Sequence, residues 1–341
     1  MLAAQEQDPD LVAAHTTAAA PSIARWVEQR HGLGVRQCYL LRRGLNDHYA
    51  VHAADGTRYV ARLYSIRPRG GFNIDFEAAL LAHLDAQGVG VASLVAGVDG
   101  RTHFPLRFPE GPRVMALFRH ADGSIPETPP EFELTGAELS RIHAAASTYA
   151  GPPSCYTLDG EHLAGRTLRY LQEYPDIDGG LARSYQVLVQ RVLDDLSAVE
   201  GRLTRVICHG DTHGFNNHVS RDDLGRSRTL FFDFDDAGPG YLAYDLCVLP
   251  WSYLIRKSLK EPDDVLRERW ASYVKAYREA GGMVTDKDLA AVPLFLQLRH
   301  LWNLGESLGR VHHWGTRQFP TDWLRKQPDV CEAWGQLDMA V

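Results

Sequence analysis

The stretch His209-Gly210-Asp211-Thr212-His213-Gly214-Phe215-Asn216 is followed, after a short gap, by Phe231-Phe232-Asp233-Phe234-Asp235. The first stretch places an acid and a carboxamide in one loop, and the second supplies another carboxylate at the end of a short apolar strand. Magnesium-assisted phosphoryl transfer needs one carboxylate to orient the attacking hydroxyl and two oxygen ligands to hold the metal on the nucleotide phosphates. Asp211, Asn216 and Asp233 meet that requirement in type, order and spacing. We therefore predict Asp211 as the catalytic residue and Asn216 and Asp233 as metal ligands.

A purely local interpretation competes with this one, because Asp and Asn often stabilise their own turns. A lone His-Gly-Asp triplet would favour a turn, whereas the full string, the strand and the second acidic triplet together favour chemistry. His209 and His213 are spaced like helical zinc ligands, but Gly210 and Gly214 interrupt a helix there. We expect His209 to brace the loop by hydrogen bonding.

Other polar side chains near the motif have less definite roles. His213 either lines the substrate side or packs in the loop. Asp235 and Asp236 either attract a cationic substrate or cap a helix that starts near residue 241. Asp245 is expected to be a buried acid that holds the catalytic loop, because an apolar helix surrounds it. His143 is expected in the core and His312-His313 on the surface.

Composition excludes several classes of protein. The 341 residues are 45% hydrophobic and 23% charged, as in a soluble globular protein, and the net charge of −7 argues against nucleic-acid binding. No apolar run approaches the ~18 residues of a membrane span. A P-loop motif is absent. Five scattered cysteines without a CxxC pair indicate reduced thiols in a cytoplasmic protein; they are Cys38, Cys155, Cys208, Cys247 and Cys331.

Hydrophobic periodicity predicts an α+β protein with two lobes. Residues 1–34 form a tail and a helix, residues 35–119 a small β-rich N-terminal lobe, and residues 120–341 a larger helical lobe. The predicted strands are Val35–Arg43, Asp47–Ala54, Arg58–Tyr64, Val91–Val98 and Arg113–Phe118, with a helix over Asn73–Gln87. The predicted helices of the second lobe are Glu131–Tyr149, Glu161–Gln172, Leu181–Glu200, Tyr241–Arg256, Asp263–Ala280 and Asp286–Leu308.

The two catalytic stretches resemble the aminoglycoside phosphotransferase and choline kinase superfamily, whose loop typically reads HGDxHxxN. The segment from Phe232 to Ala237, with Tyr244-Asp245-Leu246, is similar to a branch with homoserine kinase-like enzymes and bacterial stress-response kinase A. The C-terminal run from Leu298-Arg299 to Trp323-Leu324-Arg325 is also similar to that kinase. The resemblance implies a bilobal protein-kinase-like fold that uses ATP and Mg²⁺.

The resemblance also assigns nucleotide-binding positions in the first lobe. Gly44 and Asn46 lie in the turn that covers the nucleotide, and the backbone at Leu117 and Arg119 meets the adenine. Arg62 stands where many relatives have a phosphate-binding lysine, a departure that keeps the charge but changes the geometry. Glu77 matches the glutamate that pairs with this cation. Without the resemblance, Arg62 would be a surface arginine on a strand and Glu77 a solvated helix residue.

Three functions follow as hypotheses. The leading one is a kinase that phosphorylates a hydroxyl of a small molecule, such as an amino alcohol, a sugar or an antibiotic-like acceptor. The alternative is a Ser/Thr protein kinase resembling stress-response kinase A. A third, motivated by Arg62, is an inactive nucleotide-binding protein. The acceptor would be recognised by helices between about residues 160 and 200 and beyond 245, where spacing carries little chemical information. Oligomeric state and the choice between ATP and GTP stay undetermined.

Overall fold

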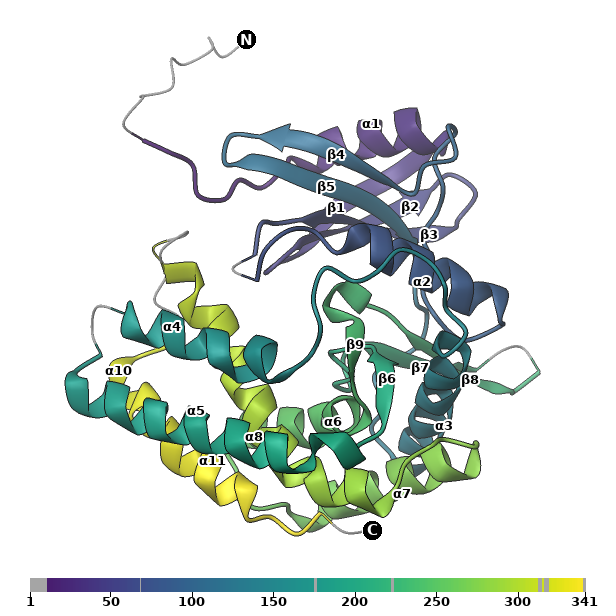
Figure 1. Cartoon of the computed structure of the whole chain (residues 1–341). Coiled ribbons are helices and arrows are strands. Elements are labelled where there is room, and N and C mark those ends of the chain that lie inside the picture. The colour runs from purple at the N-terminus through teal and green to yellow at the C-terminus, as the bar shows by residue number, and fades with distance from the viewer. Residues whose placement is uncertain are drawn as a thin grey trace. The chain divides into compact units, whose positions relative to one another are not determined.

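The computed structural model describes residues 11–67, 69–174, 177–221, 224–311, 315 and 319–339, and these form two compact units. Unit 1 consists mainly of the described residues up to 72 and of residues 94–120. Unit 2 contains residues 73–93 and most of the chain after 120. The first is rich in strands and the second in helices (Figure 1), which confirms the predicted α+β bilobal fold. The predicted surface position of His312-His313 lies outside the described residues.

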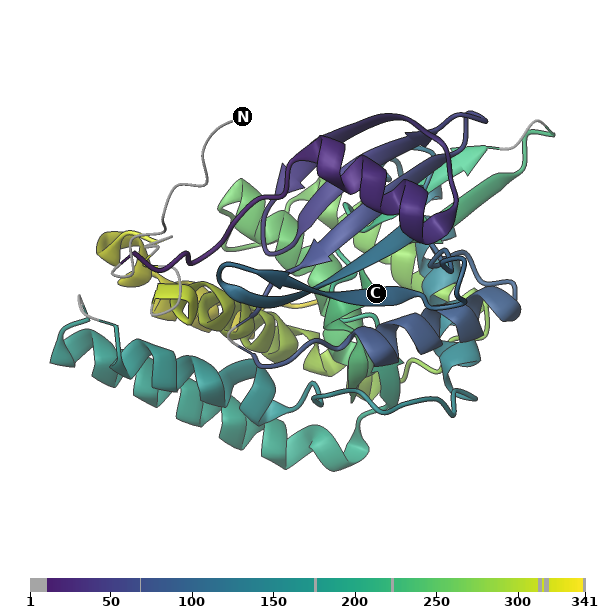
Figure 2. The same cartoon turned by 90° about the horizontal axis from the view of Figure 1, so that it is seen from above.

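Unit 1 is built on an antiparallel sheet with the strand order β1-β2-β3-β5-β4. Helix α1, Ala20–His31, has a proline in its first turn and ends at Gly32, whose φ of 67° suits glycine. Its buried Ile23 and Val27 pack on one face of the sheet against Tyr49 and Leu63 (Figures 1 and 2). The strands are β1 Val35–Arg43, β2 Asp47–Ala53, β3 Arg58–Tyr64, β4 His103–Phe108 and β5 Gly111–Arg119.

One predicted strand is wrong. Residues 91–98 form only isolated bridges, at Val91 and Leu94, and the last strand of the sheet is β4. An apolar run of this length does not distinguish a strand from a buried connection. The sequence of β4 contains Pro105, which argues against a central strand, but β4 lies at the edge of the sheet, where a proline is tolerated.

Unit 2 is mostly helical, and its helices pack in pairs, α3 against α7 and α6 against α8. The predicted helix over 161–172 begins as a π-helical turn, Glu161–Gly165, before α4. From the sequence, α2 is placed in the N-terminal lobe, whereas its residues fall in unit 2. The helices are α2 Ile74–Ala86, α3 Pro129–Ala146, α4 Arg166–Gln172, α5 Gly179–Val199, α6 Leu242–Lys257, α7 Asp264–Glu279, α8 Asp286–Leu308, α10 Thr321–Leu324 and α11 Gln327–Gly335.

Two short strand pairs in unit 2 frame the motif. Strand β6, Arg205–Cys208, pairs with β9, Gly238–Tyr241, and β7, Asn217–Arg221, forms a hairpin with β8, Ser227–Phe231. The catalytic stretch runs from β6 to β7, and Asp233 is the second residue after β8. Within the described part of the chain, no helix has the length and apolar character needed to traverse a membrane.

Candidate active site

The β7–β8 hairpin brings the three predicted site residues together at its open end. Asn217 pairs with Phe231, and the N–H of Phe232 donates to the carbonyl of Asn216 at 2.9 Å, so Asn216 and Asp233 flank the same end. The amide nitrogen of Asn216 donates to both the backbone oxygen and Oδ2 of Asp211, each at 2.9 Å. The residue before β7 and the residues after β8 therefore lie together at the open end of the hairpin.

The chemistry of these donors fits a divalent cation. Because the amide nitrogen of Asn216 donates to Asp211, its Oδ1 remains available to a metal, and no hydrogen bond to that oxygen is found among the described residues. Asp233 has φ 71° and ψ 57°, a left-handed conformation that aspartate tolerates better than most residues. The described residues contain no cluster of three or more His, Cys, Asp or Glu suited to a metal. A magnesium ion that arrives on a nucleotide takes its remaining oxygens from phosphates and water.

Asp211 is held through both of its carboxylate oxygens. An Nη of Arg299 donates to Oδ1 at 2.5 Å, and Nε2 of His213 lies 3.3 Å from Oδ2. Burial alone would raise the pKa of Asp211, but His213 and Arg299 outweigh it and hold that pKa far below its usual range. Asp211 is therefore ionised at every ordinary pH.

Arg299 is a site residue that motif reasoning misses. It lies on α8, is 3% exposed, and also donates to the carbonyl of Gly210 at 3.0 Å and to the hydroxyl of Tyr244 at 2.9 Å. Its guanidinium lies over the rings of Trp302 and Trp251, at 4.2 and 4.7 Å from their centroids. An arginine inside an apolar helix requires a buried partner. Its position among apolar residues was the sequence feature that could have indicated this role.

Asp245 braces the catalytic loop, as predicted. Its two oxygens accept from the N–H groups of His209 at 2.7 Å and Gly210 at 2.8 Å. His143, buried as expected, contacts the same carboxylate with Nε2 at 3.0 Å. Gly210 has φ 85°, and a Cβ there would stand 2.1 Å from the carbonyl oxygen of Asp236. The loop therefore depends on glycine for both its backbone conformation and its close approach.

His209 ties the loop to the segment that carries Asp233. The N–H of Asp211 donates to Nδ1 at 3.2 Å, so Nε2 carries the proton and donates to the carbonyl of Phe232 at 3.1 Å. Burial lowers the pKa of His209, although Asp245, Asp211 and Asp233 oppose that shift. His209 is therefore neutral, and both of its ring nitrogens form hydrogen bonds with backbone groups. This confirms the prediction that His209 braces the loop by hydrogen bonding.

The neighbouring acids do not cap a helix. Helix α6 starts at Leu242 without a side-chain cap, while Asp235 and Asp236 lie earlier in a 3₁₀ turn, Phe234–Asp236. The helix-capping alternative for these two acids is therefore wrong. Both are buried, and the backbone oxygen of Asp235 accepts from the hydroxyl of Tyr156 at 2.7 Å. Their attraction of a cationic substrate stays a prediction.

Two of the predicted nucleotide residues of unit 1, Asn46 and Arg62, are buried. The side-chain oxygen of Asn46, beside Gly44, accepts from the N–H of Ser65 at 3.1 Å, so it ties the turn to the end of β3. Arg62 is 4% exposed and lies over the ring of Phe118 at 4.7 Å, so it is not a surface arginine.

The other residues assigned to the nucleotide are also held within the folded units. The carbonyl of Leu117 accepts from the N–H of Val95 at 2.8 Å, and Arg119 pairs with Tyr59 in the sheet. Glu77 is fully buried, in unit 2, so it is not a solvated helix residue. Its pairing with Arg62 and all contacts to a nucleotide stay predictions.

Comparisons with known proteins identify the family. A sequence model of the "Phosphotransferase enzyme family" matches residues 41–283. An uncharacterized protein of Deinococcus radiodurans is 34% identical over 310 residues, covering 89% of this chain and 86% of the relative.

Two solved structures have the same fold. Amicoumacin kinase hAmiN, in complex with AMP-PNP, Ca²⁺ and Ami, superposes with a TM-score of 0.70 at 20% identity, covering 94% of this chain and 96% of that one. A microcompartment-associated aminopropanol kinase gives a TM-score of 0.65 at 21% identity, with coverages of 92% and 95%.

The fold is thus that of the aminoglycoside phosphotransferase and choline kinase superfamily. This chain belongs to the phosphotransferase enzyme family, whose model spans more than half of it. The protein is therefore an enzyme of the kinase type, which transfers a phosphoryl group to an alcohol acceptor.

Proposed function

We propose that this enzyme uses ATP and Mg²⁺ to phosphorylate a hydroxyl group of a small molecule. The observation that carries the proposal is the convergence of Asp211, Asn216 and Asp233 at the open end of one hairpin. One acid that orients the nucleophile and two oxygen donors that bind the metal are the minimum that phosphoryl transfer requires. Magnesium, when bound, would neutralise charge on the transferring phosphoryl group.

Asp211 orients the acceptor hydroxyl rather than acting as a strong base. Its carboxylate is ionised, and Arg299 and His213 lower its proton affinity. A loose phosphoryl-transfer transition state requires little proton abstraction by a base, so positioning provides most of the catalysis. Asn216 and Asp233 would hold the metal, each by a side-chain oxygen.

The structural neighbours support a small-molecule acceptor over a protein. Among them are proteins named amicoumacin kinase, aminopropanol kinase and putative fructosamine-3-kinase. The complex of the first with AMP-PNP and Ca²⁺ supports a nucleotide and a divalent cation here. All five cysteines are free thiols, which supports a cytoplasmic location.

An ADP-release screen tests the proposal. The purified chain is incubated with ATP and Mg²⁺ over amino alcohols, sugars, hydroxy acids, aminoglycosides and macrolides, with Asp211→Asn as the blank. Acceptor-dependent ADP release that the blank lacks supports the proposal. Phosphate incorporation from labelled ATP into the chain itself, without acceptor, favours a protein kinase instead. Thermal stabilisation by ATP with no transfer to any acceptor would establish an inactive nucleotide-binding protein.

A further inference from the structure

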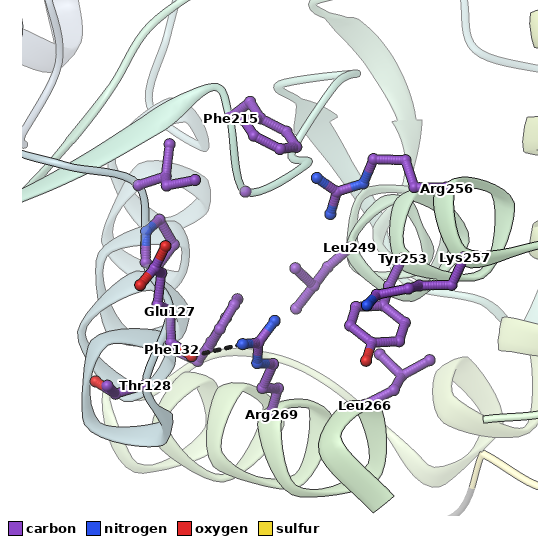
Figure 3. Close-up of a pocket in the computed structure, with 13 residues that line it drawn as sticks. Glu127, Thr128, Phe132, Phe215, Leu249, Tyr253, Arg256, Lys257, Leu266 and Arg269 are labelled. Atoms are coloured by element: carbon purple, nitrogen blue, oxygen red, sulfur yellow. Dashed lines mark hydrogen bonds between the residues drawn. The ribbon is translucent and has the colours of Figure 1, made fainter. Parts of the chain in front are cut away.

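A cavity of about 630 Å³ lies within unit 2 beside the end of the catalytic loop (Figure 3). Gly214 and Phe215 form one wall, the residues that lead into α3 form a second, and the end of α6 with the first turns of α7 completes it. The sequence motifs assign no role to this cavity, although it shares the loop that carries Asp211.

Three cations line the cavity, and none of them has an acidic partner among the described residues. Arg256 donates from Nε to the carbonyl of Ser252 at 2.9 Å. Arg269 donates to the backbone oxygen of Glu127 at 2.7 Å. Lys257 lies over a tyrosine ring. Backbone carbonyls and aromatic faces thus hold the three cations, and no carboxylate of the described part of the chain forms an ion pair with them.

The two guanidinium groups point into the cavity from different sides (Figure 3). Arg256 lies 4.2 Å from the ring centroid of Phe215, and Arg269 lies 5.2 Å from that of Phe132. Stacking keeps each guanidinium in a fixed orientation, so less entropy is lost when it binds an anion. Planar guanidinium groups suit the paired oxygens of carboxylate and phosphate.

The two arginines also repel each other. Burial lowers the pKa of Arg256, and the charge of Arg269 lowers it further. The only acid on the cavity wall, Glu127, makes no ion pair with either arginine in the described residues. An anion in the cavity would relieve this repulsion. The local charge is therefore opposite to the overall net charge of −7.

The cavity is close enough to the chemistry to hold part of the acceptor. Gly214 follows Asp211 by three residues, and three extended residues span at most about 11 Å. A small molecule whose hydroxyl meets Asp211 can therefore extend into the cavity. Building on the function proposed above, we propose that the acceptor carries a carboxylate or phosphate group, which Arg256 and Arg269 bind in this cavity.

A binding experiment tests the anion site without requiring turnover. Inorganic phosphate and acetate are titrated into the full chain by calorimetry at constant ionic strength. We expect saturable binding of at least one, weakened at least about tenfold in the Arg256→Gln, Arg269→Gln double variant. The matched control is Arg267→Gln, an exposed arginine of α7 that does not line the cavity and should leave binding unchanged. Equal binding in the wild type and the double variant, or no binding in the wild type, would refute the proposed anion site.

Two further arms test the assignment to the acceptor. Displacement of phosphate by AMP-PNP would show that the cavity serves the nucleotide and would overturn the assignment. In turnover, a hydroxy acid is compared with its methyl ester. We expect kcat/KM to be at least about tenfold higher for the acid than for the ester in the wild type. In the double variant this difference should disappear because KM for the acid rises. Equal kcat/KM for acid and ester contradicts the assignment.

The two proposals fail in different ways. If no acceptor in either form releases ADP, the proposed function is wrong and the acceptor assignment falls with it. The calorimetric comparison then still decides whether Arg256 and Arg269 form an anion site.

Discussion

Arg299 holds the carboxylate of Asp211 from the buried side, with its guanidinium 2.5 Å from Oδ1. The remaining oxygen, Oδ2, faces His213 and Asn216. The guanidinium cannot turn away easily, because two tryptophan rings and the carbonyl of Gly210 fix its plane. Asp211 is thus an ionised acid in one orientation, as a group that positions a hydroxyl needs to be.

Replacing either predicted acid by its amide should remove activity and keep the fold. For Asp211→Asn and Asp233→Asn we expect turnover to fall by several orders of magnitude, because orientation of the hydroxyl or a metal ligand is lost. Steady-state ADP release and circular dichroism measure the two effects. Rates near wild type in a purified, folded variant would refute the assigned role.

Removal of Arg299 should change the pH dependence of the enzyme. In Arg299→Met the pKa of Asp211 rises, because the guanidinium is one of the groups that, with His213, oppose the effect of burial. The rate should then fall as the pH drops through that new pKa, whereas the wild type keeps Asp211 ionised throughout. We also expect roughly 3 kcal/mol lower unfolding free energy from the broken buried pair.

Two comparisons separate positioning by Arg299 from bulk stability. Arg299→Lys retains the charge and should remove the acid limb of the pH–rate profile, with part of the activity restored. Lys287→Gln, an exposed substitution on the same helix, should behave like the wild type. A profile for Arg299→Met without an acid limb contradicts the positioning role.

Gly210→Ala should damage the site by a direct clash. A methyl group there meets the carbonyl oxygen of Asp236 at 2.1 Å, so the loop must shift. Gly56 has a similar φ, 89°, and nothing lies within 4 Å of the place that a Cβ would occupy, so Gly56→Ala measures the backbone strain alone. We expect Gly210→Ala to lose most activity and more stability than Gly56→Ala, by thermal unfolding and ADP release. Equal losses in the two variants would eliminate the clash as the cause.

The stability of the folded chain should fall in mildly acidic solution because of His300. Burial lowers the pKa of this histidine from 6.5 to about 4, and its ring is bound by Trp251 and Gln327. The unfolded chain takes up the proton first, so the stabilisation is complete above pH 6.5 and is lost as the pH falls toward 4. The difference between the two pKa values corresponds to roughly 3 kcal/mol of unfolding free energy.

Urea unfolding at a series of pH values measures this dependence. His300→Gln should be less stable near neutral pH, but its unfolding free energy should decline less steeply between pH 6.5 and 4. Parallel curves for the wild type and His300→Gln would show that other groups account for the pH dependence.

Local sequence signals determine much of the fold. The predicted span of α8, Asp286–Leu308, matches the structure because a capping box at Thr285 marks its start. The Asp55-Gly56 turn likewise separates β2 from β3 at the predicted place. The interval between Asn216 and Asp233 holds a two-stranded hairpin, which is why spacing alone indicated that these residues meet.

Only the tertiary structure decided which distant groups share one environment. Arg299 reaches Asp211 across 88 positions of sequence, and the two cavity arginines come from different helices. A sequence does not show where a charged side chain points. Whether a cation meets an acidic partner depends on the packing of helices that are far apart in the chain. The sequence by itself therefore determined the residues of the catalytic loop and the class of chemistry. Packing determined the ionisation of Asp211 and, among the residues that the structure describes, left Arg256 and Arg269 without an acidic partner.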